Sequence, residues 1–220
     1  MPALLDHVFI CTAVGAPAAD QLRDFGLQEG SPNRHPGQGT ACRRFFFQNA
    51  MLELLWVEDA AEAQSDQTRR TRLWDRWCAR DQGASPFGIV LRPASQQQTQ
   101  IPFPSWEYRP PSMPDLVLHI ATGTELEEPM WCYIEVGRRP DEARPERRQP
   151  LEHPAGFRQI TSVRIAGPVL DDAALTPAMA RTGIIALQSG KEHLLELEFD
   201  GRPNANRTDF RPALPLVLCW

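Results

Sequence analysis

Short apolar runs rich in β-favouring residues recur along most of the chain, separated by polar segments that hold many of its glycines and prolines. Such runs, bounded by turn residues, are typical of β-strands. Strands are predicted on this basis at residues 4–12, 43–48, 51–58, 86–92, 106–108, 116–120, 130–136, 160–165 and 194–199. Asn49-Ala50 joins the second and third of these runs and favours a tight hairpin there.

Helical periodicity is confined to three segments, residues 16–25, 68–80 and 171–182. In the middle one, Leu73, Trp77 and Cys78 would form the apolar face, with arginines on the other side. Residues 29–40 and 137–154 have no apolar face and are predicted to be surface loops. Many strands with few helices indicate an α+β fold.

The last third of the chain resembles the first. Residues 160–165 align with 5–10, and residues 194–199 match the Leu-Glu-Leu run near Glu53. A β-α-β-β order at both ends is the kind of internal repeat that sets a whole architecture.

The composition is that of a globular protein, with 42% hydrophobic and 23% charged residues among 220. A formal net charge of −5 argues against a nucleic-acid-binding surface. The five cysteines are scattered, as expected of buried thiols in a reducing compartment. The first residues do not look like a signal peptide, and no apolar run is long enough to cross a membrane. We therefore expect a single cytoplasmic domain over residues 1–220.

Five short motifs occur in order along the chain: His7 in Leu-Asp-His-Val, residues 35–40, Glu53 in Leu-Glu-Leu, residues 133–135 and His153-Pro154. Together they resemble the motifs of the vicinal oxygen chelate superfamily, which includes the glyoxalases and the bleomycin-resistance proteins, and their order is more specific than any one of them. The resemblance spans roughly residues 4 to 200 and points to a glyoxalase-like domain. It implies paired βαβββ modules that form a curved mixed sheet around one cavity with flanking helices. The first module would cover about residues 4–60, and the second half about 85–200 with inserted loops.

The same resemblance implies a divalent metal, Ni, Zn, Mn or Fe, held by residues at the first and last strands of each module. His7 would project into the cavity beside Leu5 and Phe9, and Glu53 beside Met51 and Leu55, because alternate strand residues share a face. Glu135 is a further candidate ligand. Glu135 and Glu196 remain alternatives for completing the site or acting as the catalytic base. His35, Gln38 and Thr40 are candidates for contacting a substrate.

The second module lacks an obvious ligand on its first strand. The matching position is Gly88, or Ser162 if residues 160–165 form that strand, and neither is a good ligand. A two-histidine, one-carboxylate site would need a second histidine, for which His119 and His153 are the candidates.

Two functions remain open. One is a metal-dependent lyase, isomerase or dioxygenase acting on a small oxygenated metabolite. The other is a metal-free protein that sequesters a small apolar molecule, which the missing ligand and the many tryptophans would suit. Either would bind a small molecule, with no nucleic acid and no membrane as partner, and the resemblance makes a homodimer a reasonable expectation.

Overall fold

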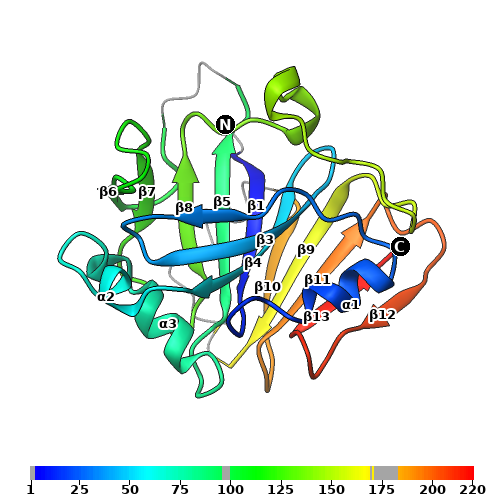
Figure 1. Ribbon diagram of the computed structural model, residues 1–220. Coiled ribbons are helices and arrows are strands. Elements are labelled where there is room, and N and C mark those ends of the chain that lie inside the picture. Colours follow the sequence, from blue (N-terminus) through cyan, green and yellow to red (C-terminus); the bar gives the residue numbers. More distant parts are fainter. Residues whose placement is uncertain (1–2, 96–99, 169, 171–182) are drawn as a thin grey trace.

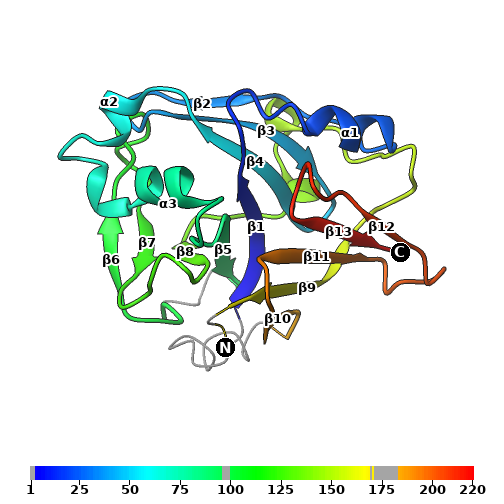
Figure 2. The same ribbon diagram turned by 90° about the horizontal axis from the view of Figure 1, so that it is seen from below.

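The computed structural model describes residues 3–95, 100–168, 170 and 183–220. The helix predicted at residues 171–182 lies outside the described residues. Two curved mixed sheets, neither of them closed, share an apolar core that lies between them (Figures 1 and 2). The architecture confirms the α+β fold and the curved mixed sheet predicted above.

The larger sheet has eight strands in the order β2-β3-β4-β1-β5-β8-β7-β6. Their bounds are β1 Ala3–Cys11, β2 Asn33–His35, β3 Thr40–Phe46, β4 Met51–Val57, β5 Phe87–Pro93, β6 Ser105–Tyr108, β7 Leu118–Ala121 and β8 Met130–Ile134. Strand β2 lies within residues 29–40, which are predicted above to form a loop. Its three residues form a strand because they pair with β3, and the local sequence pattern does not indicate this pairing. The predicted hairpin after β3 is present, with the Phe47 amide donating to the Ala50 carbonyl over 2.8 Å.

This strand order is symmetric about the antiparallel pair β1–β5. Strand β1 runs parallel to β4, and β5 runs parallel to β8. Strands β3 and β7 then pair antiparallel to β4 and β8, and β2 and β6 form the edges. The sheet therefore consists of two equivalent four-stranded halves, the second of which is complete by Ile134.

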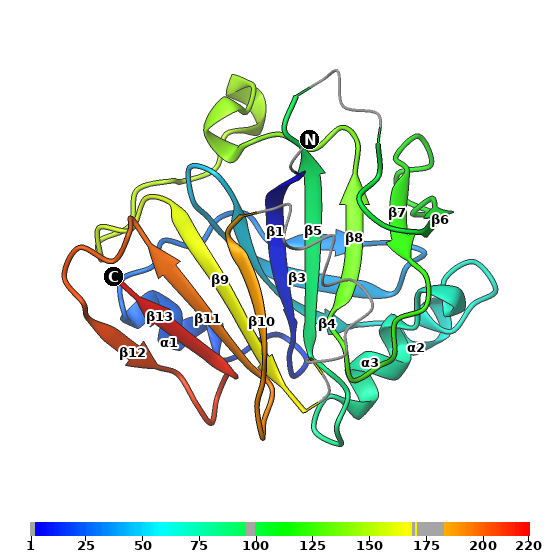
Figure 3. The ribbon, with the colours of Figure 1, turned by 180° about the vertical axis from the view of Figure 1, so that it is seen from behind.

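The smaller sheet has the order β10-β9-β11-β13-β12 and lies against the outer face of the larger one (Figure 3). Its bounds are β9 Ile160–Gly167, β10 Ile185–Ser189, β11 Leu194–Phe199, β12 Arg207–Asp209 and β13 Leu216–Cys219. Parallel β9–β10, antiparallel β9–β11 and parallel β11–β13 repeat the pairings of β1–β4, β1–β5 and β5–β8. Strand β11 thus occupies the position of β5 in this pattern. The sequence match of residues 194–199 with β4 does not correspond to the topology.

The helices among the described residues are short: α1 Ala19–Asp24, α2 Ala60–Ala63 and α3 Leu73–Ala79, with 3-10 turns η1 Arg69–Thr71, η2 Pro140–Glu142 and η3 Pro145–Arg147. In the view of Figure 2, α3 lies inside the curve of the eight-stranded sheet. No helix among the described residues has the length and apolar character needed to span a membrane.

The helix predicted at residues 68–80 is interrupted at Arg72, which has a left-handed backbone with φ of 58°. The apolar face also differs from the prediction, since Cys78 is exposed and Arg76 is buried. Arg76 donates hydrogen bonds to the carbonyls of Ser85, Leu126 and Glu128, so its guanidinium ties three loop carbonyls together. Helical periodicity could not reveal this, because the partners are distant in sequence.

Candidate functional site

The concave face of the eight-stranded sheet encloses a cavity of about 150 Å³. It is lined by His7, Phe9, His35, Gln38, Glu53, Leu55, Thr71, Leu73, Val90, Tyr108, Pro110, Met113, Leu116, Leu118, Ile120, Met130, Cys132 and Ile134. The ionisable side chains His7, His35 and Glu53 lie on the wall formed by β1, β2 and β4, while β7 and β8 contribute apolar side chains and the Cys132 thiol. None of the six tryptophans, all within the described part of the chain, lines this cavity.

His7 faces the cavity beside Phe9, as predicted, but Leu5 does not. A register shift between Leu5 and His7, where β1 pairs with β5, reverses the alternation. Leu5 therefore packs in the core between the sheets, and His7 remains on the concave face. The irregularity brings Asp6 beside the imidazole, with its Oδ1 at 2.7 Å from His7 Nδ1.

Asp6 controls the orientation and the charge of His7. Its carboxylate accepts from Nδ1–H, which leaves Nε2 without a proton in the neutral ring and facing Glu53 Oε2 at 3.5 Å. Burial alone would lower the pKa of His7, but the Asp6 hydrogen bond and the charges of Asp6 and Glu53 outweigh it and raise the pKa. A histidine oriented by a carboxylate in this way is typical of metal ligands.

Glu53 is 6% exposed and lies on β4, with its carboxylate on the same wall. Cys42 of β3 is fully buried, and its sulfur lies within 4.8 Å of this carboxylate. Burial and the negative charge of Glu53 raise the pKa of Cys42, so without a metal it stays a neutral thiol. A carboxylate buried this deeply needs partners, and His7 and Cys42 supply them.

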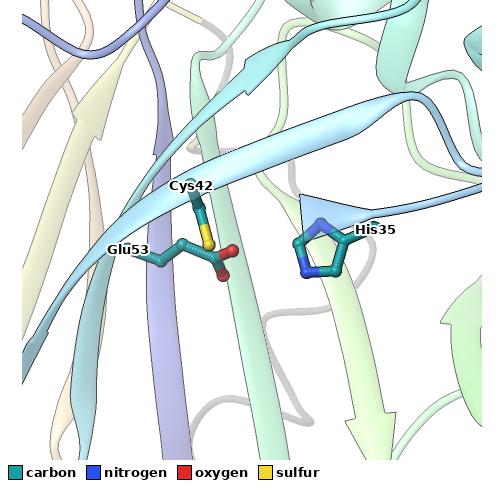
Figure 4. Close-up of side chains that lie close together, drawn as sticks. All are labelled: His35, Cys42 and Glu53. Carbon is teal, nitrogen blue, oxygen red and sulfur yellow. The ribbon is translucent and has the colours of Figure 1, made fainter. Parts of the chain in front are cut away.

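His35, at the end of β2, reaches the same wall (Figure 4). Its Nε2 lies 3.0 Å from the Asn33 amide nitrogen, which can only donate, so the ring proton is on Nδ1, 2.9 Å from Thr40 Oγ1. Gln38 Nε2 also donates to Thr40 Oγ1, and Gln38 Oε1 accepts from Tyr108 at 3.0 Å. Burial lowers the pKa of His35, so the ring is neutral near pH 7.

These side chains form a group with the chemistry of metal ligands. One ligand atom each from His35, Cys42 and Glu53 lies within 4.8 Å of the others, and His7 Nε2 approaches the same carboxylate. For ligand bonds of about 2.1 Å, adjacent octahedral positions are about 3.0 Å apart and opposite ones about 4.2 Å. The 3.5 Å between His7 and Glu53 lies between these values. Neutral imidazoles and a carboxylate are suitable donors for Zn, Mn, Fe or Ni.

Sequence reasoning missed Cys42, because a single cysteine in a strand is usually a small core residue. Alternation along β3 provides a signal, since Cys42, Arg44 and Phe46 share a face. That face belongs to the cavity only because β3 pairs with β4, where Arg44 lies opposite Glu53.

The second half of the sheet contributes no equivalent ligand. His7 and Glu53 are offset by two residues in the β1–β4 register, and the same offset from Gly88 leads to Cys132 on β8. Burial raises the pKa of Cys132 to about 12, so its thiol is neutral. The Phe9 ring occupies the space beside Gly88, where an added Cβ would lie 2.0 Å from a ring carbon. The candidate metal ligands are therefore confined to the first half of the sheet.

Glu135 and Glu196 do not lie with His7 and Glu53. Glu135 follows Ile134 on β8, and since Ile134 lines the cavity, the alternation turns Glu135 to the other face, where it pairs with His119 at 3.1 Å. Glu196 lies on β11 of the smaller sheet and forms an ion pair with Arg164. Neither carboxylate is near the cavity wall that holds Glu53.

The histidines considered as second ligands are also elsewhere. His119 is buried on the far face of β7, between two residues that line the cavity. His153 accepts from the Gln28 amide at 2.9 Å and donates to the Phe46 carbonyl at 3.0 Å, so it links a loop to β3. The histidine that joins His7 on the concave face is His35, which sequence reasoning placed among substrate contacts.

Replacing Asp6 by asparagine is expected to change how stability depends on pH in metal-free protein. The raised pKa of His7 means that its protonated form stabilises the fold below pH 6.5, and this contribution is lost as pH rises through the folded-state pKa. Without the Asp6 charge, burial dominates and protonation becomes unfavourable. The free energy of unfolding of Asp6→Asn should therefore be lower than that of wild type, by an amount that grows as the pH falls from about 8 to about 5.

Chemical denaturation with a chelator present, at both ends of that range, measures this difference. The control compares Asp6→Asn/His7→Gln with His7→Gln, for which the difference should not vary with pH. Equal pH dependence in the two comparisons would contradict the assignment to His7.

Comparison with known proteins supports the same architecture. The profile of a glyoxalase-like domain family matches residues 5–182. No curated protein matches the chain. Among solved structures, it resembles a hypothetical protein from Staphylococcus aureus with a TM-score of 0.55 and 11% identity over 99% of both chains, which shows a shared fold alone. From the family match over most of its length, the chain belongs to the glyoxalase-like domain family of the vicinal oxygen chelate superfamily.

Proposed function

We propose that this protein is a divalent-metal-dependent enzyme acting on a small oxygenated metabolite, with His7, His35 and Glu53 as the metal ligands. The observation that carries the proposal is the convergence of these three side chains on one wall of a cavity to which β7 and β8 contribute apolar side chains. Two histidines and one carboxylate with open positions are the donor set of non-haem iron oxygenases, so Fe(II) and Mn(II) are the first metals to test.

The chain's own residues already meet several requirements of such a site. Asp6 holds the His7 ring with Nε2 free, and the lowered pKa of His35 keeps that ring neutral near pH 7. To ligate, His35 would exchange its Asn33 hydrogen bond for the metal. Cys42 would remain beside Glu53 as a neutral thiol and restrict the orientation of the carboxylate. The metal, when bound, would stabilise negative charge on substrate oxygen atoms as a Lewis acid.

Side chains at the same wall would also contact the substrate. Gln38 bridges Thr40 and Tyr108, so its amide links β3 to β6 across the cavity. Burial raises the pKa of Tyr108 to about 12, which keeps its hydroxyl a hydrogen-bond donor. The apolar side chains of β7 and β8 would exclude water from the rest of the substrate, and Glu135 and Glu196 have no part in this proposal.

Metal analysis of purified protein tests the proposal. Wild type reconstituted with Fe(II) or Mn(II) is expected to retain close to one metal per chain, and His7→Ala to lose it, by mass spectrometry. The matched control is His119→Ala, which removes a buried histidine from the opposite face of the same sheet and should keep the metal. Absence of stoichiometric binding of Fe, Mn, Zn or Ni to wild type would refute a metal-dependent function.

A metal-free binding protein is the second candidate, and the missing ligand at Gly88 favours it. The tryptophans that suggested an apolar binding pocket give no support, because none lines the cavity. If metal does not bind, binding of small apolar molecules, detected by the thermal shift of unfolding, becomes the decisive measurement.

A further inference from the structure

A second cavity, of about 450 Å³, lies at the end of the same concave face. Its inner wall is formed by Asp6 of β1, Phe46 of β3 and Met51 of β4. Its outer wall is residues 136–149, which we call the arginine strap and which contain η2 and η3. In Figure 1 these two turns lie beyond the sheet, near the amino end of the chain.

The arginine strap is anchored at both ends. An added Cβ at Gly137 would lie 2.6 Å from Asp6 Oδ2 and 2.8 Å from Arg92 Cβ, so the backbone there packs directly on the β1–β5 pair. At the other end, Gln149 Oε1 accepts from the Ser31 amide over 2.9 Å. Between them, the Asp141 amide donates to the Gln48 carbonyl at 3.2 Å. The cavity therefore has a defined outer wall.

The charges in this cavity are unbalanced. Four arginines line it, against the two carboxylates of Asp6 and Glu142. Arg139 is paired with Asp141 at 2.6 Å. Across the described part of the chain, no carboxylate lies within ion-pair distance of the remaining three, Arg138, Arg144 and Arg147. Such a gathering of unpaired guanidinium groups, in a protein of formal net charge −5, is suited to an anion.

The cavity lies beside the proposed metal site. Alternation along β4 puts Met51, Glu53 and Leu55 on one face, and the first two lie in the neighbouring cavities. A two-residue step along a strand is about 7 Å. Asp6 belongs to the arginine-lined cavity and also accepts from His7, so the two sites share a wall.

Two more arginines add positive charge along this path. Arg44 lies opposite Glu53 in the β3–β4 register, with its guanidinium 5.1 Å from the Phe46 ring centroid. Arg92 is 6% exposed, its Nε lies 3.9 Å from Asp6 Oδ2, and among the described residues this Nε has no hydrogen-bond partner. An anion under the strap would thus meet positive charge from the sheet as well as from the loop.

We propose that the substrate carries an anionic group, a carboxylate or a phosphate, which binds under the arginine strap to Arg138, Arg144 and Arg147. This inference rests on the proposed function for the place of the reacting atoms, at His7 and Glu53, and Glu53 lies one two-residue strand step from Met51 of the arginine-lined cavity. The chemical class is then a small organic anion whose charged end is separated from its reacting oxygen atoms by a short chain. Guanidinium groups bind both kinds of anion through paired hydrogen bonds.

Titration calorimetry of the full chain with inorganic phosphate and with succinate tests this inference, before and after treatment with a chelator. Wild type is expected to bind at least one of them at a single site, and the tighter one identifies the anion. The variant Arg144→Gln/Arg147→Gln should bind it at least about tenfold more weakly, as expected when charge-assisted hydrogen bonds are lost. Arg138→Gln provides an independent second variant with an effect in the same direction.

The matched control is Arg148→Gln/Arg202→Gln, which removes the same charge from exposed positions outside the cavity, one of them in the strap itself. It should bind within about twofold of wild type, because screening makes distant surface charges weak contributors. Equal weakening in both double variants, or no binding of either anion to wild type, would overturn the inference.

Metal content measured on the same samples separates this inference from the proposed function. Anion binding that depends on the strap arginines in a protein without metal would support the anion site and reject the metal-dependent function. Stoichiometric metal together with anion binding that is indifferent to these arginines would reject the anion site alone.

Discussion

Glu53→Gln is expected to weaken divalent-metal binding by more than the roughly 10–100-fold that loss of an outer-shell partner costs. Glutamine has nearly the same shape as glutamate, so the packing around β4 is retained while the negative charge is removed. In a site shielded from water, that charge contributes far more than it would at the surface. Glu53 is 6% exposed and would be the only anionic ligand of the proposed set.

A competition titration against a chromophoric chelator, near pH 8 where more of His7 is neutral, measures this loss. Glu135→Gln is the matched control, because its side chain is 58% exposed and lies on the opposite face of the sheet. The metal affinity of Glu135→Gln should equal that of wild type. Retention of wild-type affinity by Glu53→Gln would show that the metal, if bound, is held elsewhere.

Gly39→Ala is expected to lower the free energy of unfolding by about 3 kcal/mol, combining left-handed backbone strain with overpacking. Gly39 has φ of +73°, and an added Cβ would lie 2.2 Å from the Asp59 carbonyl oxygen and 2.6 Å from the Ala63 amide nitrogen. Both are backbone atoms, which cannot rotate away. Relief of the overlap would shift the turn that places Gln38 and Thr40 in the site.

Gly15→Ala separates the two contributions. Gly15 has nearly the same φ, +77°, but no atom of the described residues lies within 4 Å of an added Cβ. Its substitution should therefore cost only the backbone strain, about 1 kcal/mol. Urea denaturation of both variants gives the comparison. Similar decreases in the free energy of unfolding of the two variants would mean that the turn at Gly39 shifts at no cost in stability.

The hydrogen bonds of Gly39 explain why its turn has little freedom to yield. Its carbonyl accepts from the amides of Glu58 and Asp59, and its own amide donates to Glu62 Oε2 at 3.0 Å. The carboxylate of Glu62 also accepts from Gly37 at 2.6 Å. The turn between β2 and β3, which follows His35 and contains Gln38, is therefore held by the first turn of α2.

The sequence predicts which side chains face the cavity at some positions of the strands and fails at others. Alternation along a strand predicts correctly that His7 and Phe9 share a face, as do Glu53 and Leu55. The same rule fails for Leu5, because a shift in pairing with β5 reverses the face at Asp6. Such a shift depends on the partner strand and leaves no mark in local hydrophobicity.

The choice between Glu135 and Glu196 also depends on tertiary structure and not on the local sequence. Each lies in a strand with a suitable pattern, and the motif around each is equally short. Only the order of the strands places β8 in the concave sheet and β11 in the other one. Even in β8, the cavity faces Ile134, so Glu135 points to the opposite side.

The amino-acid sequence by itself determined the strand-rich α+β class, the family, and the two side chains His7 and Glu53 on the cavity wall. These follow from short-range alternation and from the order of motifs, which are properties of the chain. The tertiary structure alone decided that His35 and Cys42 lie close to Glu53, that Arg76 is buried, and that arginines with no carboxylate partner among the described residues gather beside Asp6. Each of these depends on pairing between strands or loops far apart in sequence, whose register is set by packing of the whole sheet.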